Sequence, residues 1–157
     1  MDARRVLIGC LALLVMAGFM QAQSKMTEEQ ILAKAKTIHE KVISIDTHVD
    51  IGGATYATEK DDPGTLTNRK CDLVKMKNGG LKAVFLAVFV GQPRTADHGL
   101  TPEGYKRVYD QAIVGFESVH RLAEKLHPEL CGLATTPADV ERIAKTGKRV
   151  EIGRAHV

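Results

Sequence analysis

The stretch Val42-Ile43-Ser44-Ile45-Asp46-Thr47-His48-Val49-Asp50 decides the fold expected for this chain. It joins a β-branched, apolar segment to a His-x-Asp pair. Alternate residues of a strand point the same way, so His48 and Asp50 should project together from the end of a strand over residues 42–45. An imidazole and a carboxylate held this close suit a divalent metal such as zinc. The C-terminal ends of barrel strands are also where (β/α)8 enzymes keep their chemistry.

The rest of the chain alternates helical and strand-like segments. A second strand is expected over residues 81–90, which are almost wholly apolar and so typical of a strand covered on both faces. A third is expected to begin at Val150, and a short apolar piece lies at residues 130–134. Capping residues, helical spacing and Gly or Pro at the ends indicate helices over four segments: residues 28–41, 72–77, 101–127 and 136–146.

This order predicts an α/β fold with a parallel sheet, because buried strands joined by helical crossovers run in the same direction. Two strands and the start of a third cannot close a barrel, so we expect an incomplete sheet. Residues 51–69 have no sustained period and are expected to form a long loop. At the C-terminal end of a barrel strand, such a loop would cover an active site.

The N-terminus has the pattern of a secretory signal peptide. Arg4-Arg5 precede an apolar run over residues 6–20, and Gln21-Ala22-Gln23-Ser24 offers a small residue for cleavage. We therefore expect residues 1–22 to be removed, residues 23–150 to form the folded domain, and the protein to be exported. An uncleaved membrane anchor is the alternative, although a run of about 15 apolar residues is shorter than the ~20 that span a bilayer.

Composition argues against a nucleic-acid partner. The formal charge is +3 without a basic block, and the chain has no Trp, so neither a phosphate-binding patch nor a base-stacking surface is indicated. Cys71 and Cys131 remain after the signal segment. Their spacing is not that of a metal site, and the sequence leaves open whether they pair in a disulfide or stay separate thiols.

Three elements in order resemble the membrane (renal) dipeptidase family of zinc peptidases. They are Ile45-Asp46-Thr47-His48-Val49-Asp50, then Cys71-Asp72-Leu73-Val74-Lys75-Met76-Lys77-Asn78-Gly79-Gly80, then the apolar run from Ala83 to Val90. The family pattern is a D-x-H-x-D strand end, a loop, and D-L-x-x-M-x-x-G-G before the second strand. The resemblance covers about residues 30–150.

The resemblance implies the N-terminal part of a (β/α)8 barrel that carries two zinc ions and hydrolyses dipeptides. His48 and Asp50 match the two ligands that the family's first strand gives to one zinc. The family's bridging Glu ends the third strand, and its further ligands follow later. Glu151 lies too early in its strand to match that Glu, and His156 matches no motif of the family. A zinc ion that takes only two protein ligands falls short of the usual three.

Residues 151–157, Glu-Ile-Gly-Arg-Ala-His-Val, resemble the translation of a common sequencing adapter, GAG ATC GGA AGA GCA CAC GTC. We expect an artefactual tail on a truncated gene, so that the natural frame stops near Val150. The codons for these seven residues test the expectation. The sequence thus favours an exported zinc dipeptidase of which this chain is an inactive piece. A non-catalytic binding protein on the same barrel, or another metal-dependent amidohydrolase-like enzyme, is the alternative.

Other polar residues are assigned no metal or substrate role. Asp46 either orients His48 or caps the loop. We expect Asp61 and Asp62 to be solvated loop charges. Met76 and the stripe from Tyr105 to Phe116 are expected in the core. Four histidines are expected at the surface or outside the site: His39, His98, His120 and His127. Dipeptide preference and oligomeric state are not fixed by the sequence.

Overall fold

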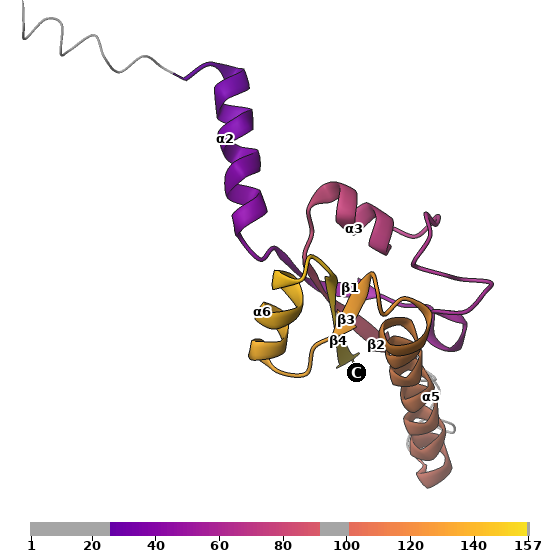
Figure 1. The fold of residues 1–157 in the computed structure, drawn as a ribbon. Helices are drawn as coiled ribbons and strands as arrows, with labels where there is room; N and C mark the ends of the chain where they lie inside the picture. Colours follow the sequence, from indigo (N-terminus) through magenta and orange to yellow (C-terminus); the bar gives the residue numbers. More distant parts are fainter. Residues whose placement is uncertain (1–25, 92–100, 157) are drawn as a thin grey trace, which may run out of the picture. The chain divides into compact units, whose positions relative to one another are not determined.

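The computed structural model describes residues 26–91 and 101–156 (Figure 1). The expected signal peptide and His98 lie outside these residues. The chain divides into two units, Met1–Ile38 and His39–Val157, and each is treated by itself below. Among the described residues, no helix is long and apolar enough to cross a bilayer.

Helix α2 (Glu28–Lys41) has the bounds that the sequence predicted. The backbone N–H of Gln30 donates to Thr27 Oγ1 at 3.2 Å, and the N–H of Thr27 donates back to Gln30 Oε1 at 3.0 Å. This reciprocal pair is the capping box expected from Thr27 and Gln30, which satisfies two of the N–H groups that a helix start leaves without partners.

The second unit is built on a parallel four-stranded sheet in the order β1-β2-β4-β3 (Figure 1). The strands are β1 (Ile45–Asp50), β2 (Ala83–Phe89), β3 (Cys131–Leu133) and β4 (Arg149–His156). The parallel sheet and the strand beginning near Val150 are confirmed. The apolar piece at residues 130–134 proves to contain a further strand, which pairs with Arg149–Glu151 only.

Strand β1 lies later in the chain than the predicted residues 42–45. Ladder pairing begins with Ile45 opposite Ala83. Immediately before it, the carbonyl of Ser44 accepts from the backbone N–H groups of Lys82 and Ala83 at 3.3 and 3.0 Å. Pairing with β2 therefore sets where the strand starts, and it extends the strand through the polar residues up to Asp50. His48 lies within β1 and Asp50 is its last residue, so the pair lies at the C-terminal end of the strand, as the sequence predicted.

The helices of this unit begin and end as their capping residues predict. They are α3 (Leu73–Gly79), α5 (Pro102–Arg121), which continues as the π-helical turn η2 (Leu122–Leu126), and α6 (Pro137–Lys145). The side chains of Asp72, Thr101 and Thr136 each accept a backbone N–H of the following first turn. Helix α3 ends at Gly80, whose φ of 72° is a conformation that glycine adopts without the strain a side chain would bring.

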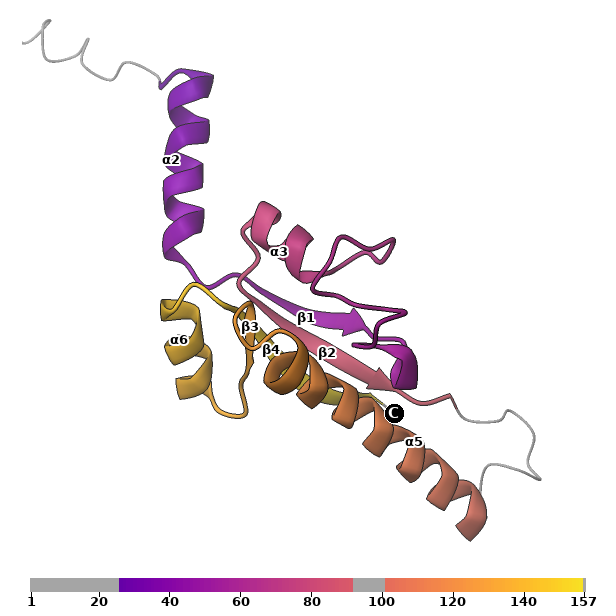
Figure 2. The same cartoon turned by 45° about the vertical axis from the view of Figure 1, so that its right-hand side comes forward.

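The core lies on both faces of β2, as its continuous apolar sequence predicted. Val84, Leu86 and Val88 are buried on one face with residues from α3 and α5, and Ala83 is buried on the other with Ile143 of α6. Figure 2 shows α5 running alongside the sheet. The contact is close, because a Cβ added at Gly115 would lie 2.5 Å from Val88 Cγ1.

The apolar stripe of α5 is buried only in its C-terminal half. Met76 is buried as expected, but Tyr105 is 56% exposed and Phe116 is only half-buried. The prediction that the stripe from Tyr105 onward belongs to the core was therefore wrong for its first turns. Helical spacing identifies the face that turns toward the sheet but not how far along the helix the sheet extends.

Candidate metal centre

A β-bulge in β1 positions the His-x-Asp pair. Asp46 lies opposite Val84 and Val49 opposite Leu86, so β1 has one more residue than β2 between these two points. Asp46 Oδ1 accepts the backbone N–H of His48 at 2.9 Å within the bulged segment. Bulges of this kind re-aim side chains and are frequent beside active sites. Asp46 therefore acts on the backbone of His48.

His48 and Asp50 do point to the same side of β1, as the strand period predicted. His48 Nε2 lies 3.2 Å from Asp50 Oδ1, and the two side chains are 41% and 77% exposed. Two ligands about 2.0–2.2 Å from one tetrahedral zinc stand roughly 3.3 Å apart. The donor types, their separation and their accessibility thus fit one zinc ion. Two ligands alone do not complete a zinc site. The described residues contain no group of three or more His, Cys, Asp or Glu side chains that could hold a metal.

A cavity of about 610 Å³ opens beside the pair. The side chains of Asp46, His48 and Asp50 line one side of it, and Arg69 and Lys75 contribute positive charge from the segment before and within α3. Its remaining lining residues are Val49, Lys70, Cys71, Met76, Gly79 and Leu81. The cavity carries charged groups of both signs beside the His48–Asp50 pair, and it has room for a small zwitterionic ligand.

The D-L-x-x-M-x-x-G-G element anchors this side of the cavity. The Asp72 carboxylate, whose side chain is fully buried, accepts from Lys75 Nζ at 2.8 Å and from both the N–H and the hydroxyl of Thr67 at 3.0 Å. Lys75 Nζ also donates to the carbonyls of Thr67 and Arg69 at 2.6 Å each. Burial alone would raise the pKa of Asp72, but these hydrogen bonds outweigh it and lower the pKa to about 2. Lys75 was missed by sequence reasoning, although its place three residues after a capping Asp was a signal.

The loop after β1 is more ordered than the sequence suggested. It contains a 3-10 turn, η1 (Gly53–Thr55). Asp61 pairs with Arg69, whose guanidinium lies over the Tyr56 ring at 5.3 Å from its centroid. Asp62 Oδ1 lies 2.8 Å from His127 Nε2.

The prediction that Asp61 and Asp62 are solvated was therefore wrong, because each carboxylate has a side-chain partner, Arg69 within the same loop for Asp61 and the distant His127 for Asp62. The Arg69 hydrogen bond lowers the pKa of Asp61. His127 was expected at the surface but is only 19% exposed, with the loop packed on its ring. His39 and His120 are exposed, as expected.

Glu151 is buried without a hydrogen-bond partner for Oε1. It pairs in register with Val84, and burial raises its pKa to about 8. It is not part of any three-donor group with His48 and Asp50. Nothing is described for the side chain of His156.

The two cysteines are separate thiols in this structure. Burial raises the pKa of Cys71 to about 11 and that of Cys131 to about 12, with the nearby Glu151 carboxyl adding to both. A thiol with so high a pKa is a poor nucleophile and a poor metal ligand at neutral pH. Of the two alternatives that the sequence left open, this arrangement corresponds to the unpaired one.

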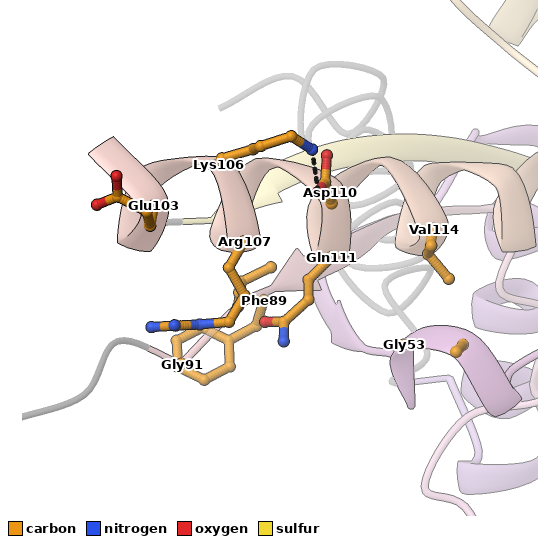
Figure 3. Close-up of a pocket in the computed structure, with 11 residues that line it drawn as sticks. Gly53, Phe89, Gly91, Glu103, Lys106, Arg107, Asp110, Gln111 and Val114 are labelled. Carbon is orange, nitrogen blue, oxygen red and sulfur yellow. Dashed lines mark hydrogen bonds and ion pairs between the residues drawn. The ribbon is translucent and has the colours of Figure 1, made fainter. Parts of the chain in front are cut away.

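A second cavity, of about 650 Å³, lies away from the pair (Figure 3). It is formed by the end of β2, by η1 and by the first turns of α5. Figure 3 shows the ring of Phe89 beside the side chains of Arg107 and Gln111, with the Lys106–Asp110 ion pair on the same helix. The described residues that line it include no His or Cys and only two carboxylates, one of them paired, so these residues do not form a metal site.

The structure is a parallel sheet with helices, and the first strand of that sheet carries a His–Asp pair suited to a metal ion. Residues 32–153 match the family model described as membrane dipeptidase, peptidase family M19. The chain belongs to this family, which confirms the resemblance. No curated protein matches it.

A solved structure shares the fold. The crystal structure of the probable dipeptidase PvdM from Pseudomonas aeruginosa is similar to this chain with a TM-score of 0.68 and 23% sequence identity. The similarity covers 82% of this chain and 32% of that one. The chain thus spans about a third of its structural relative. It forms a partial (β/α)8 barrel, as predicted.

Proposed function

We propose that this chain is the N-terminal part of an exported zinc dipeptidase and that His48 and Asp50 supply the first zinc's share of protein ligands. The observation that carries the proposal is the 3.2 Å separation of His48 Nε2 and Asp50 Oδ1 on a bulged strand, in a chain of the dipeptidase family. Two zinc ions are expected in the complete enzyme. Zinc bound by such ligands lowers the pKa of water and polarises a carbonyl.

The residues of this chain would prepare the site in three ways. Asp46 holds the bulge that turns His48 outward, through its bond to the His48 amide. The Asp72–Lys75 pair fixes the segment that lines the cavity. The cavity's carboxylates and cations offer complementary charge to the amino and carboxylate ends of a dipeptide.

Zinc binding by the purified chain tests the ligand pair. We expect weak 1:1 binding that His48→Gln or Asp50→Asn weakens by roughly tenfold or more, because each removes one of only two protein ligands. Isothermal titration with Zn²⁺, or Co²⁺ absorption, measures it. His120→Gln is the control, since His120 also lies beside a carboxylate, at 2.8 Å from Glu124. Equal loss in the control would show adventitious binding and contradict the proposal.

An assay of dipeptide hydrolysis tests whether this chain is catalytically active. Residues 23–150, purified and supplied with Zn²⁺, are expected to show no dipeptide hydrolysis above the zinc-only background, because the described residues offer two donors where catalytic zinc needs three. Release of free amino acids is the assay. Zinc-dependent turnover by the fragment would contradict the prediction. The full reading frame separates the alternatives, since a non-catalytic relative on the same barrel would lack the downstream Glu and His ligands.

A further inference from the structure

Arg121, the last residue of α5, binds the backbone that follows β1. Its Nε donates to the carbonyl of Ala57 at 2.7 Å, and its Nη2 donates to the carbonyls of Tyr56 at 2.9 Å and Ala54 at 3.5 Å. A guanidinium presents its donors in a rigid planar fork and so can hold several acceptors at once. These contacts join residues more than 60 positions apart in the sequence, which helical spacing alone does not reveal.

The carbonyl that Arg121 holds most closely belongs to an unusual residue. Ala57 has a φ of 57°, the one positive φ at a non-glycine position in the described residues, and its side chain is completely buried. A left-handed conformation at a residue with a Cβ carries strain of the order of 1–3 kcal/mol and persists only where the surroundings enforce it. Arg121 donates to the carbonyl of this residue and so contributes to holding its conformation.

A second contact from the same helical segment holds the loop further on. His127 Nε2 lies 2.8 Å from Asp62 Oδ1, while His127 Nδ1 lies 3.3 Å from Glu129. The chain packs directly on this ring, because a Cβ added at Gly64 would lie 2.1 Å from His127 Nε2. Arg121 and His127 thus bind the loop after β1 at two places, at residues 54–57 and at Asp62.

We propose that Arg121 is a positioning residue for the metal pair. It fixes the path of the chain from Ala54 to Ala57, and so the direction in which β1 ends at Asp50. Asp50 itself is 77% exposed, so packing does little to hold it. The hydrogen bonds from Arg121 to the carbonyls of Ala54, Tyr56 and Ala57, called the clamp below, limit its motion. This inference rests on the proposed zinc site at His48 and Asp50.

The test compares wild type with Arg121→Gln and Arg121→Lys in two measurements on the purified chain. In the metal-free chain, hydrogen exchange at residues 53–58 should be about tenfold faster or more in Arg121→Gln, since three carbonyls lose their donor. Zinc affinity should fall roughly tenfold, as for other residues that support a ligand. Arg121→Lys should fall between wild type and Arg121→Gln, because its ammonium keeps a charged donor but lacks the planar fork that binds the carbonyls of Ala54, Tyr56 and Ala57 together.

Two control variants separate positioning from general loss of stability. Val119→Ala removes buried methyl groups from the same helix and lowers global stability, but it should leave exchange at residues 53–58 and zinc affinity of the folded chain unchanged. Lys125→Gln removes an exposed positive charge from η2 and should change neither. If Val119→Ala reproduces both effects of Arg121→Gln, the positioning role is overturned.

Ala57→Gly gives an independent arm. Glycine adopts a positive φ without strain, so Arg121→Gln should speed exchange much less in an Ala57→Gly background than in wild type. If Arg121→Gln speeds hydrogen exchange equally in both backgrounds, Arg121 does not hold Ala57 in its positive φ, and the clamp is overturned. Unchanged zinc affinity in Arg121→Gln despite faster exchange would overturn the positioning role alone. If wild type binds no zinc, the proposed function fails and this role with it, whereas the exchange data still decide whether the clamp exists.

Discussion

Replacing Glu151 with leucine is expected to stabilise the chain by several kcal/mol near pH 8 and to flatten its pH dependence. The carboxyl is buried with one oxygen unpartnered, and burial raises its pKa from an ordinary 4.5 to about 8. Because the folded state holds this proton more tightly than the unfolded state, the contribution of Glu151 to stability is fully present below pH 4.5 and is lost as the pH rises through about 8. The loss is about 1.4 kcal/mol per pH unit in that window, or on the order of 4 kcal/mol in total.

Urea unfolding between pH 5 and 9 measures this effect. Glu151→Gln should remove the pH dependence but keep the cost of a buried polar group, whereas Glu151→Leu should remove both. Glu117→Gln, at an exposed position on α5, is the control and should stay within about 0.5 kcal/mol of wild type. A wild-type chain whose stability does not fall between pH 5 and 8 would show that Glu151 reaches water or a partner.

Replacing Asp72 with alanine is expected to destabilise the chain by about 2 kcal/mol. Its fully buried side chain caps α3 and accepts from Lys75 and Thr67. Its loss removes the cap and leaves the backbone N–H of Thr67 without its acceptor, whereas Lys75 is partly exposed and keeps two carbonyl acceptors. The pKa of Asp72 is lowered to about 2. Its contribution is therefore present above the unfolded value near 4 and is lost as the pH falls through about 2.

Chemical unfolding at pH 7 and at pH 2–4 measures the contribution of Asp72. Asp72→Asn should lose less at pH 7 than Asp72→Ala, because the amide can still accept one hydrogen bond at the start of α3. Lys77→Ala, on the same helix, is the matched control and should change stability little. Equal stability of Asp72→Ala and wild type at pH 7 would mean that the Thr67–Asp72–Lys75 network contributes nothing.

Local signals predicted most of the helices and the parallel sheet. The capping pair Thr27–Gln30, the Thr101-Pro102 start and the Gly79-Gly80 stop all describe interactions within a few residues, so the sequence carries them directly. The family elements located the His48–Asp50 pair. The same-side arrangement of the pair follows from strand period, and the structure shows it at 3.2 Å.

Contacts between distant segments could not be predicted from spacing. The partners of Asp61, Asp62 and Arg121 lie 8, 65 and 64–67 positions away in the chain. The start of β1 depends on where β2 pairs with it, and Tyr105 is exposed because the sheet does not extend beneath the first turns of α5. Each of these misses concerns a tertiary neighbour, which residue type and period do not specify.

The short strand β3 has a consequence for how a longer chain would fold. It pairs with Arg149–Glu151 only, so within the described residues the remainder of β4 has its hydrogen-bonding groups free on that side of the ladder. This edge can pair with a further parallel strand of a longer chain, and while it is unpaired it can recruit another molecule.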